Sequence, residues 1–151
     1  MQRIAIRTNT GHYLTAVNGG GMGEAANKLP IHTDAGKLGG WEQFKVKFHQ
    51  DGYCTIQTQA GHYLTAVNGG GVGNATHPVS TDRTAIRSWE TFTVEHVSKG
   101  TYAFKTAKGT YLSAVNGGGI GEDANKLPLH TDAKKVGPWE KFVIVPVHCP
   151  P

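Results

Sequence analysis

The sequence predicts an all-β fold, a β-trefoil in which three four-stranded repeats close around a pseudo-threefold axis. Three observations predict it: an internal repeat that fills the chain, alternating apolar and polar residues within each copy, and glycine-rich turns between the alternating segments. One small unit of short strands cannot bury its apolar face alone, whereas three units can share one core and leave few open edges. A three-bladed propeller is the competing architecture, but propellers typically have about four blades or more.

Two sequence blocks carry the repeat. The first is YLTAVNGGG, which occupies 13–21 and 63–71 and returns with one Thr-to-Ser change at 111–119. The second is a Trp-Glu pair followed, one residue later, by Phe, and it occupies 41–44, 89–92 and 139–142. Successive blocks are 48 or 50 residues apart, so we expect copies of approximately 1–48, 49–96 and 97–151 within a single domain over 1–151. The middle copy is two residues shorter.

Each copy contains four short segments that predict strands. In the first copy these segments lie near 3–8, 12–17, 28–33 and 41–48. Glycine-containing turns between the first two segments predict a hairpin in every copy; they are Asn9-Thr10-Gly11, Gln59-Ala60-Gly61 and Lys108-Gly109. The Asn-Gly-Gly-Gly runs after the second segments predict tight loops, because glycine permits positive φ.

The composition excludes several classes of protein. Only 17% of the 151 residues are charged and the formal net charge is +4, while apolar residues make up 38%. That content suits a single core and argues against disorder. No apolar run approaches the ~20 residues of a membrane span, and no three basic residues are consecutive, so neither a membrane span nor a nucleic-acid partner is expected. The first residues, 1–7, contain no apolar stretch typical of a signal peptide, so none is expected within this sequence.

The Trp-Glu pairs are the strongest candidates for a binding site. They are Trp41 and Glu42, Trp89 and Glu90, and Trp139 and Glu140. Each Trp is expected to open the fourth strand after a loop, where one ring face can stack on the C–H patch of a sugar while a Glu accepts hydroxyl hydrogen bonds. The alternative is that the Trp closes the barrel as a core residue and the Glu holds a loop N–H.

Other repeated residues have structural roles first. The Tyr-Leu pairs are expected in the core and barrel wall; they are Tyr13 and Leu14, Tyr63 and Leu64, and Tyr111 and Leu112. Asparagines before the glycines are possible secondary sugar contacts: Asn18, Asn68 and Asn116. One aspartate per copy is expected to cap a turn through its own backbone or, failing that, to contact sugar; these are Asp34, Asp82 and Asp132.

Metal, cofactor and catalytic sites are not expected. The eight histidines do not follow the threefold repeat. The position of His12 and His62 is occupied by Thr110 in the third copy, and the position of His32 and His130 by Ser80 in the second. The two cysteines, Cys54 and Cys149, have neither disulfide-framework nor metal-ligand spacing. A glycosidase needs two carboxylates close together, whereas the repeat places one Glu in each copy. Threefold symmetry favours multivalent binding over catalysis.

The two repeated blocks resemble the fascin-like, or actin-crosslinking-like, branch of the β-trefoil proteins over the whole chain. They are especially similar to the glucan-binding β-trefoil modules of carbohydrate-binding module family 92. The resemblance implies a noncatalytic lectin-type module with three equivalent Trp/Glu sites for a β-1,3- or β-1,6-glucan, a monomer attached to a glycoside hydrolase in a larger secreted protein. The alternative is a fascin-type actin-binding or scaffolding role in the cytoplasm, although actin-bundling fascin has several trefoils in one chain and this chain has one.

Overall fold

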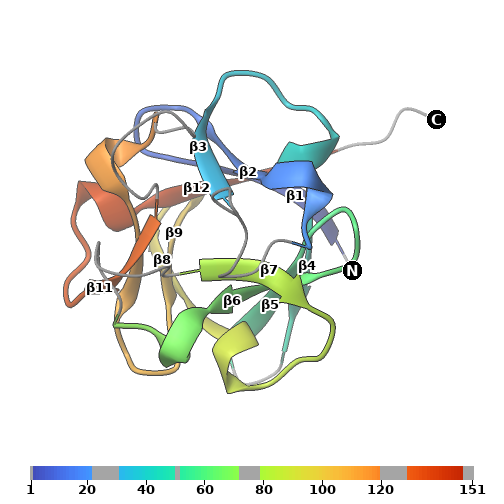
Figure 1. Cartoon of the computed structure of the whole chain (residues 1–151). Helices are drawn as coiled ribbons and strands as arrows, with labels where there is room; N and C mark the ends of the chain where they lie inside the picture. The colour runs from blue at the N-terminus through green and yellow to red at the C-terminus, as the bar shows by residue number, and fades with distance from the viewer. Residues whose placement is uncertain (1, 22–30, 50–51, 72–78, 120–128, 148–151) are drawn as a thin grey trace.

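The computed structural model describes residues 2–21, 31–49, 52–71, 79–119 and 129–147 (Figure 1). Within these ranges lie twelve strands and six single-turn 3₁₀ helices. The strands are β1 (Gln2–Arg7), β2 (Tyr13–Ala16), β3 (Ile31–Ala35), β4 (Phe44–Phe48), β5 (Tyr53–Gln57), β6 (Tyr63–Ala66), β7 (Val79–Arg83), β8 (Phe92–Ser98), β9 (Thr101–Lys105), β10 (Tyr111–Ala114), β11 (Leu129–Ala133) and β12 (Phe142–Pro146). The 3₁₀ helices are η1 (Val17–Gly19), η2 (Gly40–Glu42), η3 (Val67–Gly69), η4 (Ser88–Glu90), η5 (Val115–Gly117) and η6 (Pro138–Glu140).

Six strands form a closed antiparallel barrel. The first and fourth strands of each copy pair around the ring in the order β1, β4, β5, β8, β9, β12 and back to β1. The second and third strands of each copy form a hairpin that extends from this ring, namely β2–β3, β6–β7 and β10–β11. Figure 1 shows the three copies around a common centre. This is the predicted all-β trefoil, and closure leaves the ring strands with no open edge.

The core repeats with the chain. Leu14 of the first copy, Phe44 from its fourth strand and their counterparts in the other copies are at most 1% exposed. The counterparts are Leu64 and Leu112, and Phe92 and Phe142. Buried residues of all three copies form one hydrophobic cluster, and within it Phe104 packs against Phe142 with ring centroids 5.8 Å apart. The predicted core role of the Leu residues is therefore confirmed, while each Tyr is half-buried in the barrel wall.

The predicted hairpin turns are present in all three copies. The glycines Gly11, Gly61 and Gly109 adopt φ of +86° to +91°, which L-residues with a side chain rarely adopt. In the first copy Gly11 N–H donates to the Thr8 carbonyl and Thr8 N–H to that of His12, and the other copies repeat both bonds. The turn sequence therefore sets the register of each first hairpin.

Two predicted strand boundaries were wrong. The third strand of the first copy runs on to Ala35 instead of ending near 33, and 28–30 lie outside the described residues. The fourth strand begins at Phe44 and not at Trp41, because Gly40–Glu42 form a 3₁₀ turn. The same turn precedes the fourth strand in the other two copies. Alternation alone does not reveal this turn, since it depends on a side-chain hydrogen bond.

Candidate functional site

The Trp and Glu of each pair lie on opposite sides of a 3₁₀ turn. Trp41 and Trp139 are 45% and 44% exposed, and Trp89 is partly buried. The adjacent glutamates are buried, with exposed fractions of 9% for Glu42, 2% for Glu90 and 8% for Glu140. A single turn thus directs a large aromatic ring to the surface and a carboxylate inward, at equivalent places in all three copies.

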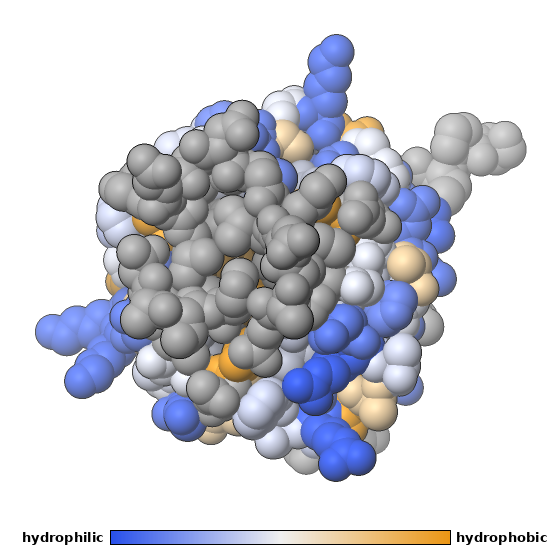
Figure 2. Space-filling view, in the orientation of Figure 1, coloured by the Kyte–Doolittle hydropathy of each residue, from blue (hydrophilic) through white to orange (hydrophobic). Residues whose placement is uncertain are grey.

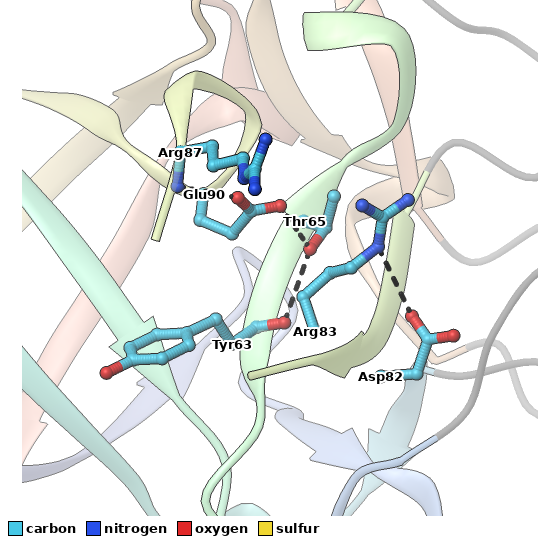
Figure 3. A network of polar contacts seen from close by, with 6 residues as sticks. All are labelled: Tyr63, Thr65, Asp82, Arg83, Arg87 and Glu90. Atoms are coloured by element: carbon cyan, nitrogen blue, oxygen red, sulfur yellow. Dashed lines mark hydrogen bonds and ion pairs between the residues drawn. The ribbon is translucent and has the colours of Figure 1, made fainter. Parts of the chain in front are cut away.

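Each buried carboxylate holds its own loop. Glu90 Oε1 accepts the backbone N–H of Arg87 at 2.9 Å, and its Oε2 accepts the hydroxyl of Thr65 at 2.8 Å (Figure 3). The first copy repeats this with Gly39 and Thr15, and the third with Gly137 and Ser113. The bond to an N–H three residues earlier is half of a capping box. Charge assistance makes these bonds strong, so the carboxylate fixes the turn that presents the Trp.

The role expected for the glutamates therefore changes. Both oxygens of each carboxylate already accept protein donors, and less than a tenth of each residue is exposed. Of the two roles open from the sequence, holding a loop N–H is the one these contacts display. The contacts of the glutamates are thus with the turn that carries the Trp, which they hold in place.

Each Trp edge lies at a junction between copies. A Cβ built on Gly19 would be 3.8 Å from Trp41 Cδ1 and 3.9 Å from the Gln59 side chain of the next copy. A Cβ on Gly69 would be 3.5 Å from Trp89 Nε1 and 3.7 Å from Lys108 Cγ. Backbone bonds close these junctions: N–H groups of Ala60, Lys108 and Thr10 donate to carbonyls of Gly19, Gly69 and Gly117.

The repeat pattern does not predict this junction, because it places each Trp-Glu pair within a single copy. The residues contributed by the next copy differ from site to site. They are Gln59 at the first site, Lys108 at the second, and Asn9 and Thr10 at the third. The sequence has one more repeated feature near each site. An aliphatic residue stands three positions before each Trp: Leu38, Ile86 or Val136. Leu38 and Ile86 are 40% and 44% exposed, so these loops carry an exposed apolar residue close to the Trp in sequence.

A hollow lies beside the middle Trp. It has a volume of about 190 Å³ and is lined by Arg83, Arg87, Ser88, Trp89 and Glu90. A neighbouring hollow of about 300 Å³ shares both arginines and Glu90 and adds Asp82, Thr84 and Ala85. The Arg83 guanidinium lies 5.7 Å from the centre of the Trp89 ring, within the range of a cation–π interaction. Figure 3 shows Arg87 next to Glu90, and Arg83 on the far side of Thr65 beside Asp82.

The secondary candidates fall in different places. The aspartates lie within β3, β7 and β11 and are exposed, so the predicted turn-capping role was wrong: the chain is extended there. Asp82 is 3.8 Å from Arg83 Nε, and Asp132 is 3.9 Å from His130 Nδ1. The backbones of Asn18, Asn68 and Asn116 lie in η1, η3 and η5, while their side chains lie outside the described part of the structure.

Among the described residues, no three His, Cys, Asp or Glu side chains gather in a way that could hold a metal ion. No helix in the described ranges has the length and apolar character needed to cross a bilayer. Cys54 is a free, buried thiol whose burial raises its pKa to about 12, and Cys149 lies outside the described residues.

Comparisons with known proteins bear on the fold. No protein-family profile and no curated protein matches the sequence. Solved structures do match it, including the designed 3-fold symmetric protein ThreeFoil, with a TM-score of 0.77 at 15% identity over 96% of this chain and 99% of that one. The Rhizoctonia solani agglutinin gives 0.70 at 20% identity over 97% and 95%. SeviL bound to asialo-GM1 saccharide gives 0.66 at 18% identity over 98% and 99%. This chain therefore shares the β-trefoil architecture of these proteins.

Proposed function

We propose that the protein is a noncatalytic, carbohydrate-binding β-trefoil with three sites, one on each of Trp41, Trp89 and Trp139. The observation that carries the proposal is the outward placement of two Trp rings, with the third partly exposed, by identically built turns. Burial of an aromatic ring is favourable because it removes a large apolar area from water. Exposure of such a ring at a repeated position therefore favours a ligand that stacks on it. Pyranose rings offer C–H faces for such stacking and hydroxyls for the polar groups around it.

The face of the molecule drawn in Figure 2 favours a sugar over an apolar protein partner. On the face in Figure 2, the surface formed by described residues is mostly hydrophilic, with hydrophobic colour in small separate places. Large apolar patches are the usual mark of a protein interface. The names of two structural neighbours, an agglutinin and a protein solved with a saccharide, agree with this choice. Within the described ranges, the repeated glutamates are bonded inward, which favours binding over catalysis.

The ligand class we propose is a polysaccharide, specifically a β-glucan with β-1,3 or β-1,6 linkages. Three weak sites on one rigid barrel would bind a repeating polymer with an avidity gain of about 10²–10⁴ over one site. The linkage rests on the resemblance of the repeated blocks to glucan-binding modules. We further propose that the protein is a monomer that serves a larger secreted glycoside hydrolase as its binding module.

Affinity electrophoresis through gels that contain β-1,3-glucan, β-1,6-glucan or an unrelated polysaccharide tests the proposal. We expect retardation by a glucan, and its loss in the Trp41→Ala, Trp89→Ala, Trp139→Ala triple variant with an unchanged circular dichroism spectrum. Phe48→Ala is the matched control, because Phe48 is an aromatic residue 53% exposed that does not line the Trp sites. Retardation that survives the triple change, or cosedimentation with F-actin without polysaccharide binding, would overturn the proposal.

A further inference from the structure

The middle copy carries two arginines that the other copies lack. Arg83 corresponds to Ala35 in the first copy and Ala133 in the third. Arg87 likewise corresponds to Gly39 and Gly137. Both arginines line the hollow that Trp89 also lines, and the Arg83 guanidinium lies 5.7 Å from the centre of the Trp89 ring.

A third cation comes from the following copy. Lys108 flanks the glycine that touches the Trp89 edge, where the first site has Gln59 and the third has Asn9 and Thr10. Its backbone N–H donates to the Gly69 carbonyl at 2.9 Å, which holds the base of this side chain at the junction. The stem of Lys108 therefore lies at the junction beside the Trp89 edge, and Arg83 and Arg87 line the hollow that Trp89 also lines.

The acidic groups nearby leave these cations available. Glu90 is 2% exposed, and its two oxygens accept the backbone N–H of Arg87 and the Thr65 hydroxyl. Asp82 is the exposed acid, and its carboxylate lies 3.8 Å from Arg83 Nε with both side chains more than 40% exposed. Such an exposed pair is weak and screened by water, so an anionic ligand can compete for the guanidinium.

From this arrangement we propose that the middle site is specialised for an acidic saccharide, a sugar ring that bears a carboxylate or sulfate group. Trp89 stacks on the ring, and Arg83 and Arg87 pair with the anion through their planar forks of N–H donors. The adjoining hollow of about 300 Å³ is at the lower end of the range of ligand pockets, which suits about one sugar unit. This inference rests on the proposed function and adds a ligand class to one of its three sites.

The test replaces the arginines by the residues of the other copies, as Arg83→Ala with Arg87→Gly. Binding is followed by the three Trp indole N–H signals in NMR titrations, assigned with single Trp→Phe variants. The probes are an oligogalacturonate, a sulfated glucan oligosaccharide and a neutral β-glucan oligosaccharide. We expect the acidic probes to shift the Trp89 signal first, and the double variant to bind them at least about tenfold more weakly, which is the loss of one charge-assisted hydrogen bond or more.

A matched control separates a specific site from general attraction to a basic protein. Lys134→Ala with Lys135→Ala removes the same charge from the loop before Trp139, and we expect it to change acidic-probe binding at Trp89 by less than about twofold. Equal losses in both variants, or acidic probes that shift all three indole signals alike, would overturn the inference. Neutral probes that bind all sites while acidic probes bind none would overturn it and leave the proposed function standing. If no probe binds anywhere, the proposed function itself fails.

Discussion

In each repeated Trp-Glu pair, adjacent side chains point in opposite directions, the Trp toward the solvent and the Glu toward the interior. Trp41 faces outward, while the carboxylate of Glu42 turns back to the Gly39 N–H at 2.8 Å and the Thr15 hydroxyl at 2.7 Å. A buried carboxylate is tolerated only where donors satisfy it. The exposed Trp ring is therefore carried by a turn that the buried carboxylate holds in place through these two hydrogen bonds.

Removal of the brace is expected to destabilise the fold. Glu90→Ala leaves the Arg87 N–H and the Thr65 hydroxyl without their acceptor, and hydrogen bonds to a charged group contribute about 1.5–3 kcal/mol. We expect a loss of free energy of unfolding of that order, measured by urea denaturation. Asp82→Ala is the control, because this carboxylate is exposed, and its effect should be within about 0.5 kcal/mol. Equal effects of the two changes would contradict the bracing role.

Truncation of a Trp is expected to reduce polysaccharide retention more than it reduces the stability of the fold. Trp41 is 45% exposed, so Trp41→Ala should cost far less than the ~3–5 kcal/mol of a core aromatic residue such as Phe44. Polysaccharide retention should nevertheless fall. Denaturation midpoints of Trp41→Ala and Phe44→Ala provide the comparison, and a Trp variant as unstable as the Phe variant would identify the ring as a core residue.

The thiol of Cys54 is expected to be inert in the folded protein. Burial raises its pKa from 9.0 to about 12, so a thiol reagent should modify it only after unfolding. As the pH rises through 9, the unfolded chain loses this proton while the folded chain retains it, so stability falls up to about pH 12. The stability advantage of the wild type over Cys54→Ala should therefore shrink across this window. A constant difference would contradict the shifted pKa.

At the scale of elements, the glycine run that follows the second strand joins the copies. The middle glycine of each run has φ of +113° to +114° and lies against a Thr of the next copy; the three are Gly20, Gly70 and Gly118. A Cβ on Gly70 would lie 2.1 Å from Thr106 Oγ1. The run is therefore required by the packing of neighbouring copies as well as by a turn.

A graded series of glycine variants separates these two requirements. Gly36→Ala meets open space without positive φ and should be neutral, while Gly11→Ala has only the positive φ, a strain of about 1–3 kcal/mol. Gly70→Ala adds overpacking of about 1–3 kcal/mol and should be the least stable. Thermal unfolding ranks the three variants. Equal stability of Gly11→Ala and Gly70→Ala would show that the Thr106 side chain moves away from the new Cβ at little cost in free energy.

At the scale of the whole molecule, the barrel sets three Trp sites on one rigid body. Because there are only three tryptophans, each indole signal reports one site. Titration with a neutral oligosaccharide should shift all three signals independently, and each single Trp→Ala change should remove one signal without altering the other two affinities. Retention on a polymer should fall stepwise, since avidity depends on the number of sites. Retention unchanged by any single variant would argue against multivalency.

The sequence by itself determined the fold class, the copy number, the hairpin turns and the shared core. These follow from local patterns written three times: alternation, turn glycines, and apolar positions such as Leu14 and Phe44 that recur in every copy. It also singled out the Trp-Glu pairs, although it could not assign a direction to either side chain.

Only the tertiary structure decided which member of the pair faces the solvent and what surrounds it. Glu42 is turned inward by the Thr15 hydroxyl, a donor 27 residues away in the sequence, and no local pattern encodes that bond. Likewise, Lys108 reaches the Trp89 site from the next copy because barrel closure brings the two turns together. Identical sequence blocks thus acquire different surroundings at each site, since side chains distant in the chain become neighbours only when the barrel closes.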